Sequence, residues 1–141
     1  MTVLVLALAA TVAGSGGLAE APGLWRTPSD GGSLVRLAPC GRNLCGAIVS
    51  SPRLKAHPGQ RDVRNADPAK RHRPLKGLRI LEVAPGAAGQ DGEGWVYNPE
   101  DGRTYRGAIR LTPDGRLRLR GCVVRPLCKT QVWVRDNGDV F

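Results

Sequence analysis

Few residues in this 141-residue chain could perform catalysis. A serine or cysteine nucleophile needs a base beside it, and that base is most often a histidine held by a carboxylate. The two histidines, His57 and His72, both lie in one charged segment. Ser50 and Ser51 are near His57 in the sequence, but Pro52 intervenes and no carboxylate is placed to orient the imidazole. The sequence therefore predicts no catalytic residues, and an enzyme stays only as a residual hypothesis.

The same charged segment offers metal ligands in His57, Asp62, Asp67 and His72. Divalent ions bind such donors, but the surrounding residues are strongly cationic, and like charge opposes a cation. The alternative is that the two aspartates cap turns and pair with neighbouring arginines. These arginines are Arg64, Arg71 and Arg73. We therefore expect no metal site and no cofactor.

The four cysteines form two local pairs, Cys40 with Cys45 and Cys122 with Cys128. Each pair brackets a short segment of turn residues, so each could close a hairpin with its Cβ atoms near bridging distance. An even count in an exported chain argues for disulfides. Zinc is the rival, but gaps of four and five residues match the spacing of ribbon-type zinc sites poorly. The sequence predicts disulfides, and cross-pairing between the two local pairs stays open.

Residues 1–19 have the pattern of a cleavable secretion signal. An apolar run from Val3 to Ala13 is followed by small residues, and cleavage after Ala19 would leave Glu20 as the new terminus. The run is too short to span a bilayer, so no transmembrane span is expected in the mature chain. A buried first strand or an uncleaved anchor is the alternative. The pattern predicts a periplasmic protein.

The formal net charge of +9 lies wholly in the predicted mature chain, since residues 2–19 carry no charge. A basic exported protein can meet anionic lipids and glycolipids of the envelope. Nucleic acid is the other partner class for such a charge, but export argues against it. The alternative is that the charge serves solubility alone.

Short alternating runs separated by turn residues predict about eight strands. They are expected at residues 23–26, 33–39, 44–50, 78–83, 93–97, 103–111, 116–121 and 129–135. The clearest alternation is at 116–121, where Leu117 and Leu119 face inward and three arginines outward. A series of hairpins with one buried face favours a sheet that closes into a barrel, because closure leaves no strand edge unpaired. We predict an all-β fold, a small antiparallel barrel over residues 20–135, and a loose tail over residues 136–141.

Residues 51–77 break the strand rhythm, being rich in proline and charge. A structureless stretch of this length is uncommon inside a compact domain. Asp67 and Pro68 are suited to open a short helical turn, as N-cap and first helical residue. The segment is expected to be either a functional excursion or a flap with short helical turns. At one rim of the barrel it could act as a lid.

A series of segments runs in order through the mature chain: GLW from 23, CGRNLCGAIV from 40, DVRNADP from 62, RPLKGLRIL from 73, VYNPEDGRTYRG from 96, LRLRGC from 117 and TQVWVR from 130. Together they resemble the bacterial family of unknown function numbered 2147. That family is small, exported and grouped with the lipocalin-like (calycin) barrels. The resemblance therefore implies a fold and a compartment, since the activity of the family is not established.

The likeness to lipocalins extends to two residues at the end of the barrel. Lipocalins carry a Gly-x-Trp in the first strand, which matches Trp25, and a basic residue of the last strand that covers this tryptophan. The resemblance implies Arg135, or less favourably Arg106, as the covering residue through stacking and cation–π contact. The alternative is that Trp25 is an ordinary core residue.

The interior of such a barrel would be apolar with a polar mouth. Its lining is expected to be Trp95, Tyr105, Ile109, Leu117, Leu119 and Trp133. These side chains could instead fill the barrel and leave no cavity. The predicted function is non-catalytic binding of a small, lipid-like ligand, apolar or amphipathic. The alternative is an envelope interaction protein whose basic strand faces bind an anionic glycolipid or an acidic partner. These faces would carry Arg103, Arg106, Arg110, Arg116, Arg118 and Arg120.

Overall fold

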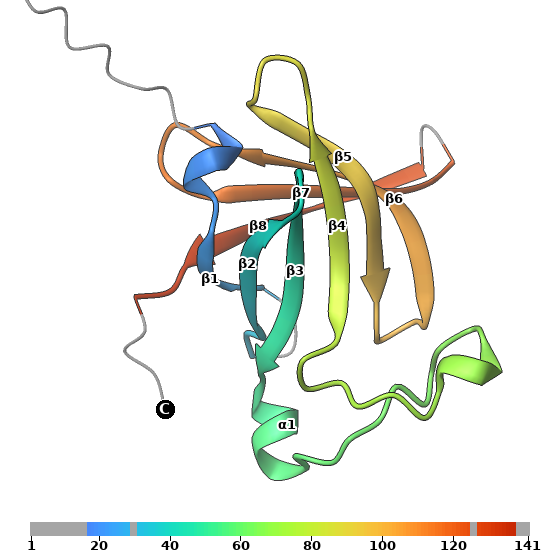
Figure 1. Ribbon diagram of the computed structural model, residues 1–141. Coiled ribbons are helices and arrows are strands. Elements are labelled where there is room, and N and C mark those ends of the chain that lie inside the picture. Colours follow the sequence, from blue (N-terminus) through green and yellow to red (C-terminus); the bar gives the residue numbers. More distant parts are fainter. Residues whose placement is uncertain (1–16, 29–30, 125–126, 138–141) are drawn as a thin grey trace, which may run out of the picture.

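Each strand pairs with its neighbour in the sequence, and the first strand also pairs with the last. The computed structural model describes residues 17–28, 31–124 and 127–137. Within these ranges, antiparallel strands in the order β1 to β8 form a closed barrel (Figure 1). The strands are β1 (Gly23–Arg26), β2 (Leu34–Cys40), β3 (Asn43–Ser50), β4 (Arg79–Pro85), β5 (Asp91–Asn98), β6 (Arg103–Leu111), β7 (Leu117–Val124) and β8 (Leu127–Arg135). The predicted all-β barrel is confirmed.

Alternation along the strands places one face of each in the core. On β7, Leu117 and Leu119 are buried while Arg118 and Arg120 are exposed, as the sequence predicts. The buried face is continuous around the barrel because every neighbouring pair of strands is hydrogen-bonded in register. The core includes Trp25, Val35, Leu37, Leu81, Val83, Ile109, Leu117 and Trp133.

Three short helices accompany the barrel in the described residues: η1 (Leu18–Glu20), α1 (Pro52–Ala56) and η2 (Pro68–Lys70). In Figure 1, α1 and η2 lie by the barrel end where β3 stops and β4 begins, and η1 (blue) lies towards the opposite end. None of the described helices is long and apolar enough to cross a membrane.

Helix η1 belongs to the packed barrel. The backbone N–H of Leu18 donates to the carbonyl of Gly89 at 2.8 Å, and the Leu18 side chain is 4% exposed. Most of the predicted secretion signal, residues 1–16, lies outside the described residues. The predicted cleavage after Ala19 would divide η1 and remove Leu18 from the core.

The chain after β8 is held to β1 at its first residue. Asp136 donates its backbone N–H to Leu24 at 2.9 Å, and its carboxylate pairs with Arg26 at 2.7 Å. The tail predicted to be loose therefore begins with a bound residue, and its last four residues, 138–141, lie outside the described ranges.

Candidate functional site

A cavity of about 540 Å³ opens at one end of the barrel. Its wall is mainly apolar, and polar groups gather at the β5–β6 turn and at the start of α1. The apolar lining includes Val35, Ile48, Leu54, Ile80, Val96, Leu119 and Trp133. The polar lining includes Arg53, Tyr97, Asn98, Asp101, Lys129 and Gln131. An apolar hollow with polar groups at its margin suits a small apolar or amphipathic molecule.

Three of the six side chains predicted to line the interior do line the cavity: Tyr105, Leu119 and Trp133. The indole of Trp133 is 2% exposed and donates to Gln131 Oε1 at 3.0 Å. Ile109 and Leu117 are also buried, but they pack in the core and are not part of the cavity wall.

Trp95 differs from the prediction. On β5, Gly94 and Val96 are opposite the fully buried Val83 and Leu81 of β4, so these positions and Gly92 face inward. Of the three, Val96 is part of the cavity wall. Trp95 is therefore on the outer face, half-buried, with Glu82 of β4 and Arg106 of β6 as its cross-strand partners. The prediction failed because two successive inward positions of this strand are glycines. Glycine has no apolar side chain, so the sequence does not show which face of the strand is buried.

Helix α1 forms part of the cavity wall. It begins at Pro52 because Ser51 caps it: the Ser51 hydroxyl accepts from the backbone N–H of Leu54 at 3.1 Å. Leu54, on the first turn, is 5% exposed and lines the cavity, as does Leu75 further along the segment. The predicted position of residues 51–77 at one rim of the barrel agrees with this geometry.

The loop after α1 is fastened to the barrel through a buried carboxylate. Asp62 has a fully buried side chain, and its Oδ1 accepts from the Tyr97 hydroxyl of β5 at 2.5 Å. Its Oδ2 accepts from Asn65 at 2.8 Å and lies 3.5 Å from Nη2 of Arg73. A buried carboxylate is stable only when paired and hydrogen-bonded, and these three partners supply both. The loop cannot lift without exposing this group.

Burial of Tyr97, together with its hydrogen bond to Asp62, raises the pKa of its hydroxyl above the ordinary value. The hydroxyl therefore stays protonated and a donor well into the alkaline range. On the loop side, Nε of Arg73 is buried and has no hydrogen-bond partner among the described residues. The sequence predicted that Asp62 pairs with a neighbouring arginine, and of the three candidates the structure shows Arg73. It missed Tyr97, which lies 35 residues away.

Two further contacts fix the same loop. The backbone N–H of Ala66 donates to the carbonyl of Gly102 at 2.8 Å, in the β5–β6 turn. Gly102 has φ 73°, and a side chain there would collide with the carbonyl of Arg64. Helix η2 begins as predicted, with Asp67 accepting from Ala69 N–H at 3.0 Å and Pro68 at the first helical position.

The opposite end of the barrel is closed around Trp25. The indole is fully buried and donates to the carbonyl of Ala21 at 2.8 Å. The guanidinium of Arg135 lies 4.3 Å from the ring centroid and also donates to the carbonyls of Pro22 and Glu20. Gly23 lies beneath this arginine, where a Cβ would be 2.7 Å from Nη1. The structure therefore brings the two residues of the expected barrel-end pair together.

The cysteines form two local disulfides, Cys40–Cys45 across β2 and β3 and Cys122–Cys128 across β7 and β8. Both disulfides link neighbouring strands. The second joins β7 to β8 beside the cavity, and Cys128 is part of the cavity wall.

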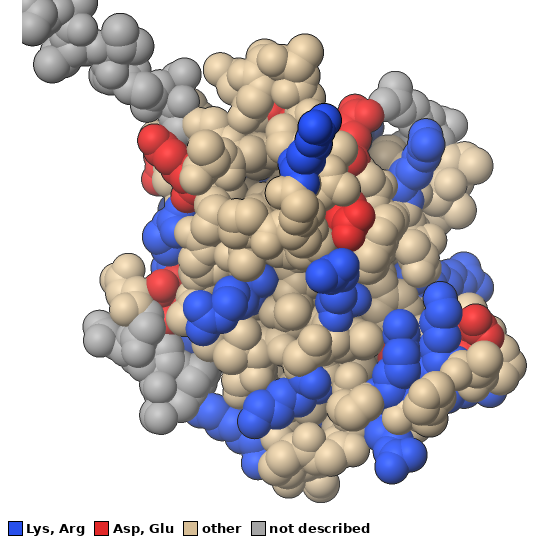
Figure 2. Space-filling model, in the orientation of Figure 1, with Lys and Arg blue, Asp and Glu red and all other residues tan. Residues whose placement is uncertain are grey.

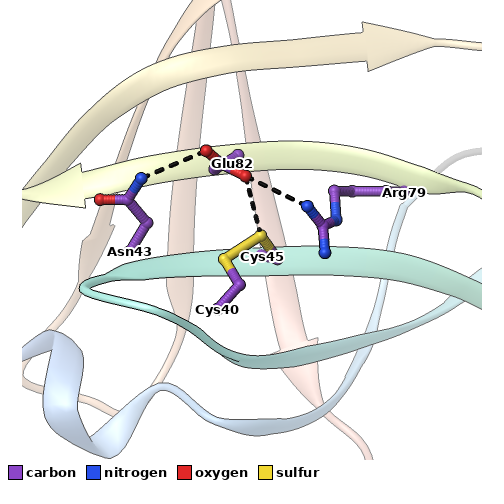
Figure 3. Close-up of a disulfide and its surroundings, with 5 residues drawn as sticks. All are labelled: Cys40, Asn43, Cys45, Arg79 and Glu82. Carbon is purple, nitrogen blue, oxygen red and sulfur yellow. Dashed lines mark hydrogen bonds and ion pairs between the residues drawn. A yellow bond between two sulfur atoms is a disulfide. The ribbon is translucent and has the colours of Figure 1, made fainter.

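Glu82 is the one carboxylate that lies against a disulfide in the described ranges (Figure 3). It accepts from Asn43 at 3.2 Å and pairs with Arg79 at 3.2 Å. Its Oε1 also lies 3.3 Å from Sγ of Cys45, a contact without a donated proton because a disulfide sulfur carries none. Metal binding by Cys40, Cys45 and Glu82 would need thiolates, which the disulfide removes.

The two histidines both lie at the surface of the described structure. His57, the residue after α1, is exposed, and His72 is exposed after η2. Neither has a hydrogen bond from its side chain to a serine or a carboxylate among the described residues.

Basic side chains are spread over the face shown in Figure 2, where they outnumber acidic ones. Two of the predicted outward arginines are neutralised: Arg110 makes two bonds to Asp91, at 2.5 and 2.8 Å, and Arg116 lies 3.5 Å from Asp114. The hydrogen bonds from Arg110 also lower the pKa of Asp91. The remaining predicted outward arginines are exposed, namely Arg103, Arg106, Arg118 and Arg120.

Comparison with known proteins agrees with the geometry. A family model described as "Uncharacterized protein conserved in bacteria (DUF2147)" matches residues 23–135, from the start of β1 to the end of β8. The chain belongs to this family. Among solved structures, protein HP1028 from the human pathogen Helicobacter pylori, described as belonging to the lipocalin family, is similar with a TM-score of 0.70. The two share 21% sequence identity over 83% of each chain, so the likeness shows a lipocalin-like fold. No curated protein matches this chain.

Proposed function

We propose that this protein is a periplasmic, non-catalytic binding module that holds a small apolar or amphipathic ligand reversibly in its barrel. The observation that carries the proposal is the cavity of about 540 Å³ with its mainly apolar wall. Small-molecule sites are typically hollows of roughly 300–1,000 Å³ with few polar groups, and this one falls inside that range.

The arrangement of the cavity supports an amphipathic ligand. The deeper wall consists of aliphatic side chains and Trp133, whereas the margin carries Arg53, Asp101 and Lys129. Within the described ranges, neither Arg53 nor Lys129 forms an ion pair. An acyl chain could occupy the apolar wall while a polar head meets the margin.

Location in the periplasm is supported by the predicted secretion signal and by the two disulfides, which persist in oxidising compartments. Mass spectrometry of protein purified natively from the periplasm would report the cleavage site, both disulfides and any bound lipid. A cytoplasmic, reduced, uncleaved product would contradict the location.

The alternative function, binding of an acidic partner by the outward arginine rows, has weaker support. Arg110 and Arg116 are already paired with Asp91 and Asp114. Arg103, Arg106, Arg118 and Arg120 are not part of the wall of the barrel cavity.

Binding can be tested with delipidated protein and fatty acids. We expect the ligand to raise the melting temperature and to quench tryptophan fluorescence, because Trp133 lines the cavity. Quenching should be lost in Trp133→Phe and kept in Trp95→Phe, since Trp95 lies on the outer face. Absence of both effects in the wild type, or equal quenching in the two variants, would contradict binding in this cavity.

A further inference from the structure

The hairpin between β7 and β8 carries the most exposed large apolar side chains of the described chain. Val123, Val124 and Leu127 are 65%, 61% and 66% exposed. A bulge shifts the strand register between Cys122 and Val124, and such a bulge bends the strand and re-aims its side chains. The disulfide Cys122–Cys128 holds the base of the hairpin. These three exposed apolar side chains thus lie next to a disulfide, and none of the described segments covers them.

These side chains lie at the cavity and have basic residues beside them on β6, β7 and β8. Val123 and Leu127 are both part of the cavity wall. Lys129 follows on β8, and Arg120 and Arg106 occupy the exposed outer face of β7 and β6 beside Cys122. Apolar side chains flanked by cations are the combination that binds an anionic membrane surface.

We propose that this apolar hairpin, consisting of Val123, Val124 and Leu127, docks on a bilayer that contains anionic phospholipid. The apolar side chains enter the interface while the neighbouring cations remain at the level of the headgroups. The net charge of +9 favours such a surface.

The same observations disfavour a second copy of the chain as the occupant. Two molecules that each carry a net charge of +9 repel one another. Three side chains also bury far less than the roughly 800 Å² per partner of a stable protein interface. A bilayer has the opposite charge and needs no such area.

Docking in this orientation brings the cavity mouth against the lipid, because the hairpin is part of the mouth. A ligand could then pass between the bilayer and the barrel without crossing water. The docking itself does not depend on the proposed function, since it concerns only the exposed side chains.

The test is sedimentation of the full-length protein with vesicles of phosphatidylglycerol and phosphatidylcholine, and with phosphatidylcholine alone. The two variants to compare are Val124→Asp and Val132→Asp. Both residues are exposed valines, Val132 is 43% exposed on the barrel wall, and each substitution adds one negative charge. Val124→Asp should weaken binding to the anionic vesicles at least tenfold relative to Val132→Asp, because loss of one inserted valine is worth about tenfold in affinity. Leu127→Gln, which leaves the charge unchanged, should weaken binding similarly.

Wild-type binding should be weaker to phosphatidylcholine alone and should decrease with added salt. Equal effects of Val124→Asp and Val132→Asp would show that binding depends on charge and not on the hairpin, and would overturn the proposal. Absence of wild-type binding to anionic vesicles would also overturn it. Self-association that Val124→Asp abolishes without vesicles would instead assign the hairpin to a second copy. The affinity of Val124→Asp for fatty acid should also be measured without vesicles. Unchanged affinity together with weaker vesicle binding shows that the hairpin acts in docking, whereas absence of fatty-acid binding in the wild type would contradict the cavity proposal alone.

Discussion

Tyr97→Phe tests the fastening of the 51–77 segment to the barrel. The substitution keeps the ring, which is 5% exposed, and removes only the hydroxyl that donates to Asp62 at 2.5 Å. Asp62 would keep Asn65 at 2.8 Å and the longer contact to Arg73 at 3.5 Å. A hydrogen bond to a buried charged group contributes about 2 kcal/mol, so we expect that loss in the free energy of unfolding. The melting temperature should decrease by about 6 °C.

The pH dependence gives an independent check of the same bond. Burial and the bond to Asp62 raise the pKa of Tyr97 above its ordinary value of 10.0. The folded state therefore holds this proton more tightly than the unfolded state, whose tyrosine titrates near pH 10. The contribution of the hydroxyl is fully present below about pH 10 and is lost as the pH rises towards the folded-state pKa. Urea unfolding at pH 8 and pH 11 should show the difference between wild type and Tyr97→Phe shrinking at pH 11.

Tyr105→Phe is the matched control, because the Tyr105 hydroxyl donates to Asp101 in an exposed pair. It should change stability by no more than about 0.5 kcal/mol. Trypsin should cleave the arginine- and lysine-rich segment 51–77 faster in Tyr97→Phe only. Equal stability losses in the two variants, or a Tyr97→Phe difference that is the same at pH 8 and pH 11, would refute the reasoning.

Gly102→Ala should destabilise the protein by about 2 kcal/mol more than Gly115→Ala, measured by urea unfolding. Both glycines have positive φ, but only a methyl at 102 collides with backbone of the 51–77 segment. Arg135→Ala should move the fluorescence of Trp25 to longer wavelength and cost about 1 kcal/mol, since the guanidinium covers the ring. Gly121→Leu should keep the fold and abolish fatty-acid binding, because a Cβ there meets only ordinary contacts at 3.7 Å inside the cavity.

The strands could be predicted because their information is local. Leu117 and Leu119 alternate with arginines, and tight turns separate the runs, so both the strand and its inward face follow from adjacent residues. The disulfides also join residues close in the sequence, at separations of five and six. The same rule fails in EGWVY, where three adjacent apolar residues fit either face. The prediction placed Trp95 inside, whereas Val96 occupies that position.

Contacts between distant segments carry no such signal. Asp62 and Tyr97 meet across 35 residues, and nothing in either local sequence indicates that a buried carboxylate fastens the segment. The sequence shows only that Asp62 has several arginines near it, so an arginine was expected as its partner and the tyrosine was not. A tyrosine within an apolar strand is typical of core packing as well as of hydrogen bonding.

Whether the barrel is hollow depends on where its inward glycines lie relative to large side chains. At Gly92 and Gly107 an added Cβ would collide with Val83 and Val96, so neighbouring side chains already occupy the space that these glycines leave. At Gly121 the nearest atom is an ordinary contact away, and the space stays open as part of the cavity. In the sequence these glycines look alike, because each sits on an alternating strand. The closed barrel sets which side chains lie next to each glycine. It therefore determines whether the space beside a glycine is filled by a neighbouring side chain or stays open for a ligand.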